Sequence, residues 1–210
     1  SELLDPIAYT ATVTNTTITL GGADQEEDER LRGRIIEAPE HFATTGTVGG
    51  YRWFVMDAHQ DVMDVAVLSP NPGEVKIYPL TASGAPSQEL KDLVAATLTH
   101  EKVRPLTDWV EVLDPVEDPP PIDMDLIVTA TADPDGVESL VSDRVTALAD
   151  LWRQRLGQSI IPSKLIAAAE TVIGVHSVSL TTPAALQDLA DEAWASATTI
   201  TVTVTGVDDG

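Results

Sequence analysis

The sequence predicts an α/β (α+β) protein of two small units, each with helices packed on a mixed or antiparallel sheet. Three observations predict this fold class. Hydrophobic residues make up 43% of the 210 residues, which is enough for a buried core. Segments with helical and with strand periodicity alternate along the chain. A proline-rich stretch, residues 115–121, separates two halves that use the same kinds of segment, and we expect it to be a stiff, extended linker.

The first unit is predicted over residues 21–114 and begins with a helix. Asp24 is a good N-cap, Glu27 lies three residues later as in a capping box, and Pro39 is expected to end the helix. Leu31 and Ile35 give this helix an apolar stripe. Periodicity predicts the other elements of the unit as helices over residues 51–58 and 90–98 and strands over 62–68, 74–80 and 109–113.

Two segments of this half have a simpler interpretation. Residues 1–20 are rich in Thr, Val and Ile, and we expect a strand segment from a truncated N-terminal region. Residues 46–50 superficially resemble a phosphate-binding loop but lack its Gly-Lys-Ser/Thr ending, so a flexible connection is expected there. Ser87 is expected to cap the helix that follows it.

The second unit is predicted over residues 122–205, followed by a tail at 206–210. Its first strand alternates with period two, so the residues at 122, 124, 126 and 128 are expected to face the core. Asp133 and Pro134 open a long helix that Gly157 is expected to close. The remaining segments are predicted as a helix over 163–172, strands over 175–181 and 198–204, and either helix or loop over 184–197.

Composition and charge exclude several classes of protein. The formal net charge is −22, and such a field repels nucleic acids and anionic membrane surfaces. The chain contains no cysteine, so disulfides and thiolate metal sites are excluded. No apolar run approaches the roughly 20 residues that a membrane-spanning helix needs. We therefore expect neither nucleic acid nor membrane as a partner.

A search for reactive groups assigns no catalytic, cofactor-binding or metal-binding residue. There is no Gly-x-Ser-x-Gly motif, and the histidines at 41, 59, 100 and 176 are scattered, with no His-x-x-x-His pair. The acids at residues 24–29 lack the features of an EF-hand loop and fit a helix N-terminus better. No cofactor is therefore expected.

Some residues leave alternatives open. Asp123 and Asp125 share one face of a strand and could serve a metal-dependent hydrolase, although a solvated face explains them as well. An exposed Trp109 or Trp194 could serve a carbohydrate-binding module. Residues 103–108, Val-Arg-Pro-Leu-Thr-Asp, form either a contact point for a partner or a structural turn in which Arg104 or Asp108 bonds nearby backbone.

An ordered set of short strings carries a family resemblance. The strings lie at residues 21–35, 38–42, 46–51, 64–73, 103–108, 174–175 and 183, and include Gly-Gly-Ala-Asp, Ala-Pro-Glu-x-Phe and Ser-Pro-x-Pro-Gly. In this order the chain resembles the Baseplate J-like family of contractile-tailed phages, prophages and tail-like injection machines. The resemblance covers residues 13–204.

The resemblance implies a structural function. It implies a wedge component of the tail baseplate, which acts in assembly through contacts with other wedge and hub proteins and with further copies of itself. It also implies that the protein lies in the virion tail, after assembly in the bacterial cytoplasm. The family brings no catalytic residues, so we expect a protein that is not an enzyme.

Overall fold

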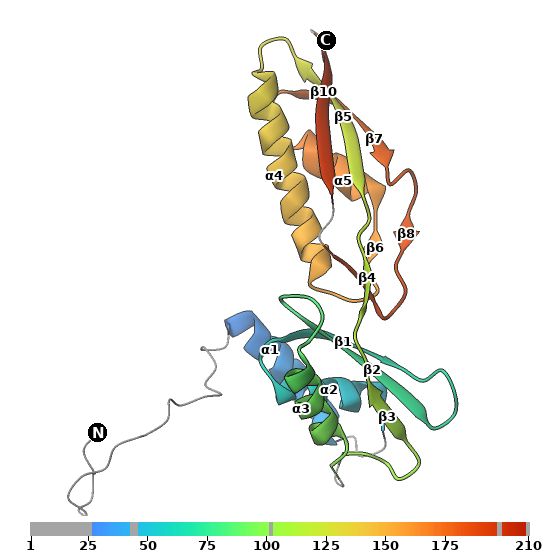
Figure 1. The fold of residues 1–210 in the computed structure, drawn as a ribbon. Coiled ribbons are helices and arrows are strands. Elements are labelled where there is room, and N and C mark those ends of the chain that lie inside the picture. Colours follow the sequence, from blue (N-terminus) through green and yellow to red (C-terminus); the bar gives the residue numbers. More distant parts are fainter. Residues whose placement is uncertain (1–26, 43–45, 101–102, 197–198, 209–210) are drawn as a thin grey trace, which may run out of the picture.

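The computed structural model of the chain describes residues 27–42, 46–100, 103–196 and 199–208. The strand predicted within residues 1–20 and the predicted cap Asp24 lie outside these ranges. Two α+β units lie end to end (Figure 1), which confirms the predicted fold class. Within the described ranges, no helix has the length and apolar character needed to cross a membrane.

The first unit packs helices on a mixed three-stranded sheet. Its elements are α1 (Asp28–Glu37), the 3-10 helix η1 (Ala38–Phe42), α2 (Val48–Ala58), β1 (Val62–Leu68), β2 (Glu74–Thr81), α3 (Gln88–Leu98) and β3 (Trp109–Val112). The strand order is β1-β2-β3, with β1 antiparallel and β3 parallel to β2. Ser87 caps α3 as predicted, because its hydroxyl accepts a hydrogen bond from the Leu90 amide at 3.3 Å. Side chains from α2, α3 and the sheet form a single buried cluster.

The second unit also has a mixed three-stranded sheet, but its strands follow one another in a different order along the chain. Its elements are β5 (Ile122–Thr129), α4 (Pro134–Arg153), β6 (Ser159–Ile160), α5 (Pro162–Glu170), β7 (Val175–Thr182), β8 (Gln187–Asp188) and β10 (Ile200–Asp208). The central strand β5 is antiparallel to β7 and parallel to β10. The predicted inward residues of β5 are all buried, at most 1% exposed: Ile122, Met124, Leu126 and Val128. They pack under α4 and α5 in a separate buried cluster.

The proline-rich stretch is extended, as predicted, but it is also paired. Residues Val116–Asp118 form β4, which runs parallel to β9 (Ala193–Ala195) of the second unit. The pairing ties the stretch to the second unit by backbone hydrogen bonds, so it is more constrained than a free linker. The domain boundaries at residues 20, 114, 121 and 205 stay predictions.

Several helix ends differ from the predictions. The helix expected after Asp24 begins only at Asp28, where Glu27 is extended (φ −67°, ψ 144°) and takes the N-cap position without a side-chain hydrogen bond. The long helix α4 ends at Arg153, before Gly157, which lies in the following turn with a φ of 62°. The positive φ explains why a glycine occupies that turn. Contrary to the prediction from the sequence, the glycine does not mark the end of the helix.

Two later segments also differ. Residues 184–197 show helical spacing, yet their described part contains β8 and β9 and no helix. Pairing with β6 and β4 decides their conformation, because a short apolar run fits either structure. The strand β10 continues to Asp208, so the described part of the predicted tail at 206–210, residues 206–208, is strand.

Candidate functional site

The predicted candidate residues do not converge on one site. In the described part of the chain, no group of three or more His, Asp or Glu side chains could hold a metal ion. His59 lies 3.6 Å from Asp61, and His176 lies 3.8 Å from Asp208 at the far end of the molecule. The side chain of His41 is outside the described part.

Asp123 and Asp125 lie on the face of β5 that points away from the helices. Their register partners on β10 are Thr201 and Thr203, and Ser179 of β7 lies beside Asp125. Both carboxylates are half-buried on this Ser- and Thr-rich sheet face. This arrangement is the solvated face of a strand, and it gives the hydrolase alternative no support.

The two tryptophans considered for carbohydrate binding differ in exposure. Trp109 is 73% exposed at the start of the edge strand β3, whereas Trp194 is 8% exposed. Trp194 packs over Gly84, where a Cβ atom would lie 2.9 Å from the indole ring. Trp194 is therefore a packing residue between the units.

The glycine-rich residues 46–50 are not a flexible connection. Thr47 caps α2 by accepting a hydrogen bond from the Gly50 amide at 3.0 Å, so Gly49 and Gly50 belong to the first turn of the helix. Gly46 has a φ of 70°, and a Cβ atom there would lie 2.7 Å from both Pro105 and Asp108. The glycine lets residues 103–108 pack closely against the start of α2.

Residues 103–108 form an anchored turn with an exposed tip. The Tyr51 hydroxyl donates a hydrogen bond to Asp108 Oδ2 at 2.8 Å. Burial of Tyr51, together with this bond and the Asp108 charge, raises the pKa of Tyr51 well above its usual value. Leu106 at the tip is fully exposed. The side-chain hydrogen bond of Asp108 therefore anchors the turn, which favours the structural interpretation. The turn also presents an apolar residue, Leu106, to solvent.

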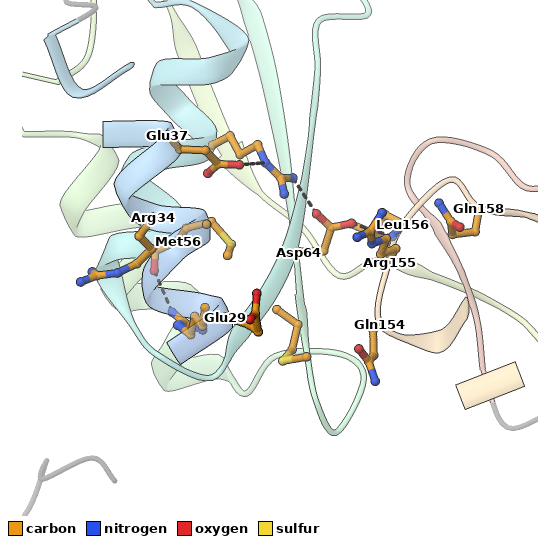
Figure 2. A pocket seen from close by; sticks show the side chains of 13 residues that line it. Glu29, Arg34, Glu37, Met56, Asp64, Gln154, Arg155, Leu156 and Gln158 are labelled. Carbon is orange, nitrogen blue, oxygen red and sulfur yellow. Dashed lines mark hydrogen bonds and ion pairs between the residues drawn. The ribbon is translucent and has the colours of Figure 1, made fainter. Parts of the chain in front are cut away.

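The most developed polar arrangement joins the two units at Asp64. This residue lies on β1 beside a register irregularity, and its side chain is only 13% exposed. Its Oδ1 accepts a hydrogen bond from Arg52 Nη1 at 2.6 Å, and its Oδ2 accepts one from the Leu156 amide at 2.8 Å. Figure 2 shows Asp64 reaching from the first unit toward Leu156 in the second. One carboxylate therefore links α2, β1 and the turn after α4.

Arg52 is itself held by several acceptors. Besides Asp64, it binds the Val65 carbonyl at 2.7 Å and Glu37 at 3.3 Å. Burial alone lowers the pKa of Arg52, but Asp64 and Glu37 outweigh that effect and raise it. The guanidinium stays charged and keeps the Asp64 carboxylate in place for Leu156.

A cleft of about 600 Å³ opens at this junction. Four of the twelve basic residues of this acidic chain line it, namely Arg30, Arg34, Arg52 and Arg155. The carboxylates of Glu29, Glu37 and Asp64 line the same cleft. Four arginines and three carboxylates leave the lining only one charge from neutral, which suits a contact between two protein parts better than a site for a highly charged ligand.

Further contacts lie at the same junction. The backbone of Leu156 forms an antiparallel bridge with Trp194, and Gly157 N donates to the Ala193 carbonyl at 2.8 Å. Through Trp194 this turn also approaches Gly84 of the first unit. The sequence pattern around Asp64 did not identify it as a linking residue. The available signal was an acidic side chain inside an apolar strand, which usually marks only a solvated face.

The fold and the junction define a two-module α+β protein whose modules are joined by a polar contact. A family model described as "Baseplate J-like central domain" matches residues 43–114, and one described as "Baseplate J-like protein C-terminal domain" matches residues 121–203. Together they match most of the chain, which therefore belongs to the Baseplate J-like family.

Individual relatives agree with this assignment. The chain is 31% identical over 173 residues to baseplate protein J of Escherichia phage P2, a match that covers 81% of this chain. The chain spans 57% of that relative's length. The fold is similar to a chain of the baseplate of the anti-feeding prophage, with a TM-score of 0.55 and 16% identity, over 87% of this chain and 43% of the other.

Proposed function

We propose that this chain is a structural wedge component of a contractile phage or prophage tail baseplate. It acts in baseplate assembly through protein–protein contacts and not as an enzyme. The observation that carries the proposal is the order of the two Baseplate J-like domains, which match the first unit from residue 43 onward and most of the second unit respectively. The likeness to phage P2 baseplate protein J supports the same function.

The junction geometry supports a structural role. Asp64, Arg52 and the Leu156 amide connect the units through short hydrogen bonds, and β4 pairs with β9 beside them. A part that sets the geometry of an assembly must hold its contact surfaces at fixed relative positions. A polar contact with defined bond directions provides such a fixed orientation.

The partners in this proposal are other wedge and hub proteins, together with further copies of the chain. The protein is placed in the virion tail, after assembly in the bacterial cytoplasm. Leu106 and Trp109 are the candidate contact residues of the first unit, because both are apolar and exposed beside an anchored turn. Large apolar side chains on a preformed surface are typical anchors of protein interfaces.

Co-expression with the neighbouring baseplate proteins of the same tail tests the proposal. The chain should co-purify with them in a complex of defined stoichiometry. Leu106→Asp should weaken the complex, whereas Leu151→Asp, a matched change at an exposed position of α4, should not. Failure of the unaltered chain to bind any of these tail proteins would overturn the proposal.

A further inference from the structure

The strand β10 lies at an edge of the sheet of the second unit. Among the described strands it pairs only with β5, and α4 packs alongside it (Figure 1). The Ile122 amide donates a hydrogen bond to the Thr199 carbonyl at 2.9 Å. Because successive residues of a strand turn their backbone groups to opposite sides, the amides and carbonyls of Ile200 and Val202 point to the free edge.

This edge lacks most of the features that block the addition of a further strand. Proteins usually protect an exposed edge with lysines, prolines, bulges or a covering segment. Residues 199–204 contain no proline and no charged residue, and the register irregularity of β10 comes only at Val204/Gly206. The Val204 amide donates a long hydrogen bond of 3.3 Å to Glu138 Oε2. A side chain that can move aside therefore occupies the place of a backbone carbonyl from an added strand.

A groove of about 480 Å³ follows this edge, between β10 and α4. Its acidic lining residues, all from α4, are Asp135, Glu138 and Asp143, and residues 200–202 of β10 form its other side. No lysine, arginine or histidine is among its described lining residues, whereas four arginines line the cleft at the junction. The groove thus carries three carboxylates and no cation, which favours a positively charged occupant.

The open face of the same sheet has the same sign of charge. Asp123 and Asp125 of β5 are the register partners of Thr201 and Thr203 on β10. Neighbouring strands lie about 4.8 Å apart, so a strand added to β10 lies about 10 Å from β5. Extended lysine and aspartate side chains together bridge that distance. A strand added at this edge therefore meets carboxylates on both of its faces.

We propose that β10 accepts an extended segment of another protein, rich in lysine or arginine, as an added strand. The backbone groups of Ile200 and Val202 bind the backbone of this segment, and its cationic side chains lie in the groove beside α4. Main-chain hydrogen bonds supply affinity in this mode of recognition, and the side chains select the partner. A second copy of the chain fits poorly, because its net charge of −22 is repelled by the groove. The site deepens the proposed function by naming a surface and a chemical class of partner, and rests on that function only for the partner's place in a baseplate.

Titration of the full chain with a synthetic peptide tests the proposal. The probe is Lys-Thr-Lys-Lys-Val-Lys-Lys-Thr-Lys, which has lysines on both faces when extended. It should bind with a Kd below about 1 mM at low salt, and the same peptide with glutamate in place of lysine should not bind. Asp143→Lys should raise the Kd about tenfold, because it places a cation in the groove. Glu170→Lys, the same change of charge at an exposed position of α5, should leave the Kd within about twofold.

Two further measurements separate strand addition from simple charge attraction. Saturating peptide should slow the hydrogen exchange of the Ile200 and Val202 amides about tenfold or more in NMR spectra, because these amides gain carbonyl partners. A peptide of the same sequence with every backbone amide N-methylated keeps its charges but cannot pair as a strand, so it should lose binding. No binding of the probe, equal binding of the methylated peptide, or binding without protection of the two amides would overturn the proposal. Co-purification with other baseplate proteins does not depend on this result, so the proposed function and the strand site fail separately.

Discussion

Replacement of Asp64 by alanine should destabilise the junction between the two units. The change removes the acceptor of the Arg52 guanidinium and of the Leu156 amide, whose bonds measure 2.6 and 2.8 Å. The Leu156 amide comes from the other unit, 92 residues along the chain. Its loss therefore affects both the stability of the fold and the orientation of the units.

The magnitude follows from the number and the exposure of the lost bonds. Hydrogen bonds to a charged group contribute about 1.5–3 kcal/mol each, and a buried donor without an acceptor costs about 1–3 kcal/mol. The Arg52 side chain is 32% exposed, so water replaces part of its lost partner. We expect Asp64→Ala to lower the free energy of unfolding by about 2–3 kcal/mol. Asp64→Asn keeps one oxygen acceptor and should cost less.

Urea denaturation and a distance measurement together check this prediction. The chain has no cysteine, so Ala96→Cys on α3 and Thr146→Cys on α4 provide two unique positions for spin labels. The label distance should be narrowly distributed in the parent and broader with Asp64→Ala. Asp61→Ala is the matched control, because the Asp61 side chain is exposed and its carboxylate lies 3.6 Å from His59 Nδ1 of the same unit.

A small effect of Asp64→Ala would contradict its role between the two units. If Asp64→Ala changes stability by less than about 0.5 kcal/mol, the typical range for a neutral surface change, and leaves the distance distribution as narrow as before, Asp64 does not hold the units together.

Other predictions concern the first unit. Tyr51→Phe should cost about 1 kcal/mol at neutral pH through the lost bond to Asp108. Because the folded state raises the pKa of Tyr51, the free energy of unfolding should fall as the pH rises above about 10. In thermal melts followed by circular dichroism, the melting temperature should fall less over this pH range in Tyr51→Phe than in the parent. Gly46→Ala should lower the melting temperature, because a Cβ atom there would lie 2.7 Å from its neighbours and φ is 70°. Gly33→Ala should raise the melting temperature slightly, because a Cβ atom there would meet nothing within 4 Å and alanine favours a helix more than glycine does. Trp109→Phe should remove most of the tryptophan fluorescence that acrylamide quenches, and a largely unchanged quenching curve would contradict the exposed position of this side chain.

Local sequence patterns were sufficient to predict a helix or strand and its buried residues where one face of that element packs on the core of its own unit. The alternation in β5 predicts its buried residues, because strand geometry alone separates the two faces. The stripe of α3 and its cap Ser87 are likewise local features. The resemblance carried by the ordered strings is confirmed by the family comparisons.

Features that depend on distant parts of the chain could not be predicted. Asp64 and Asp123 look alike in the sequence, each an acid in an apolar strand. Only the position of Leu156 makes the first a linking residue and leaves the second on an open face. The apolar stripe of α1, with Leu31 and Ile35, predicts a buried face. In the structure the arginines dock the helix instead, because Arg30 reaches carbonyls at the end of α2.

Electron microscopy of the assembled tail tests the central claim most directly. Baseplate particles that contain this chain should show density for both units, in the relative orientation set by the Asp64 junction, within the baseplate around the tail tube. Particles whose baseplate lacks the chain, or density for the chain elsewhere in the tail, would contradict its proposed role as a structural component of the baseplate.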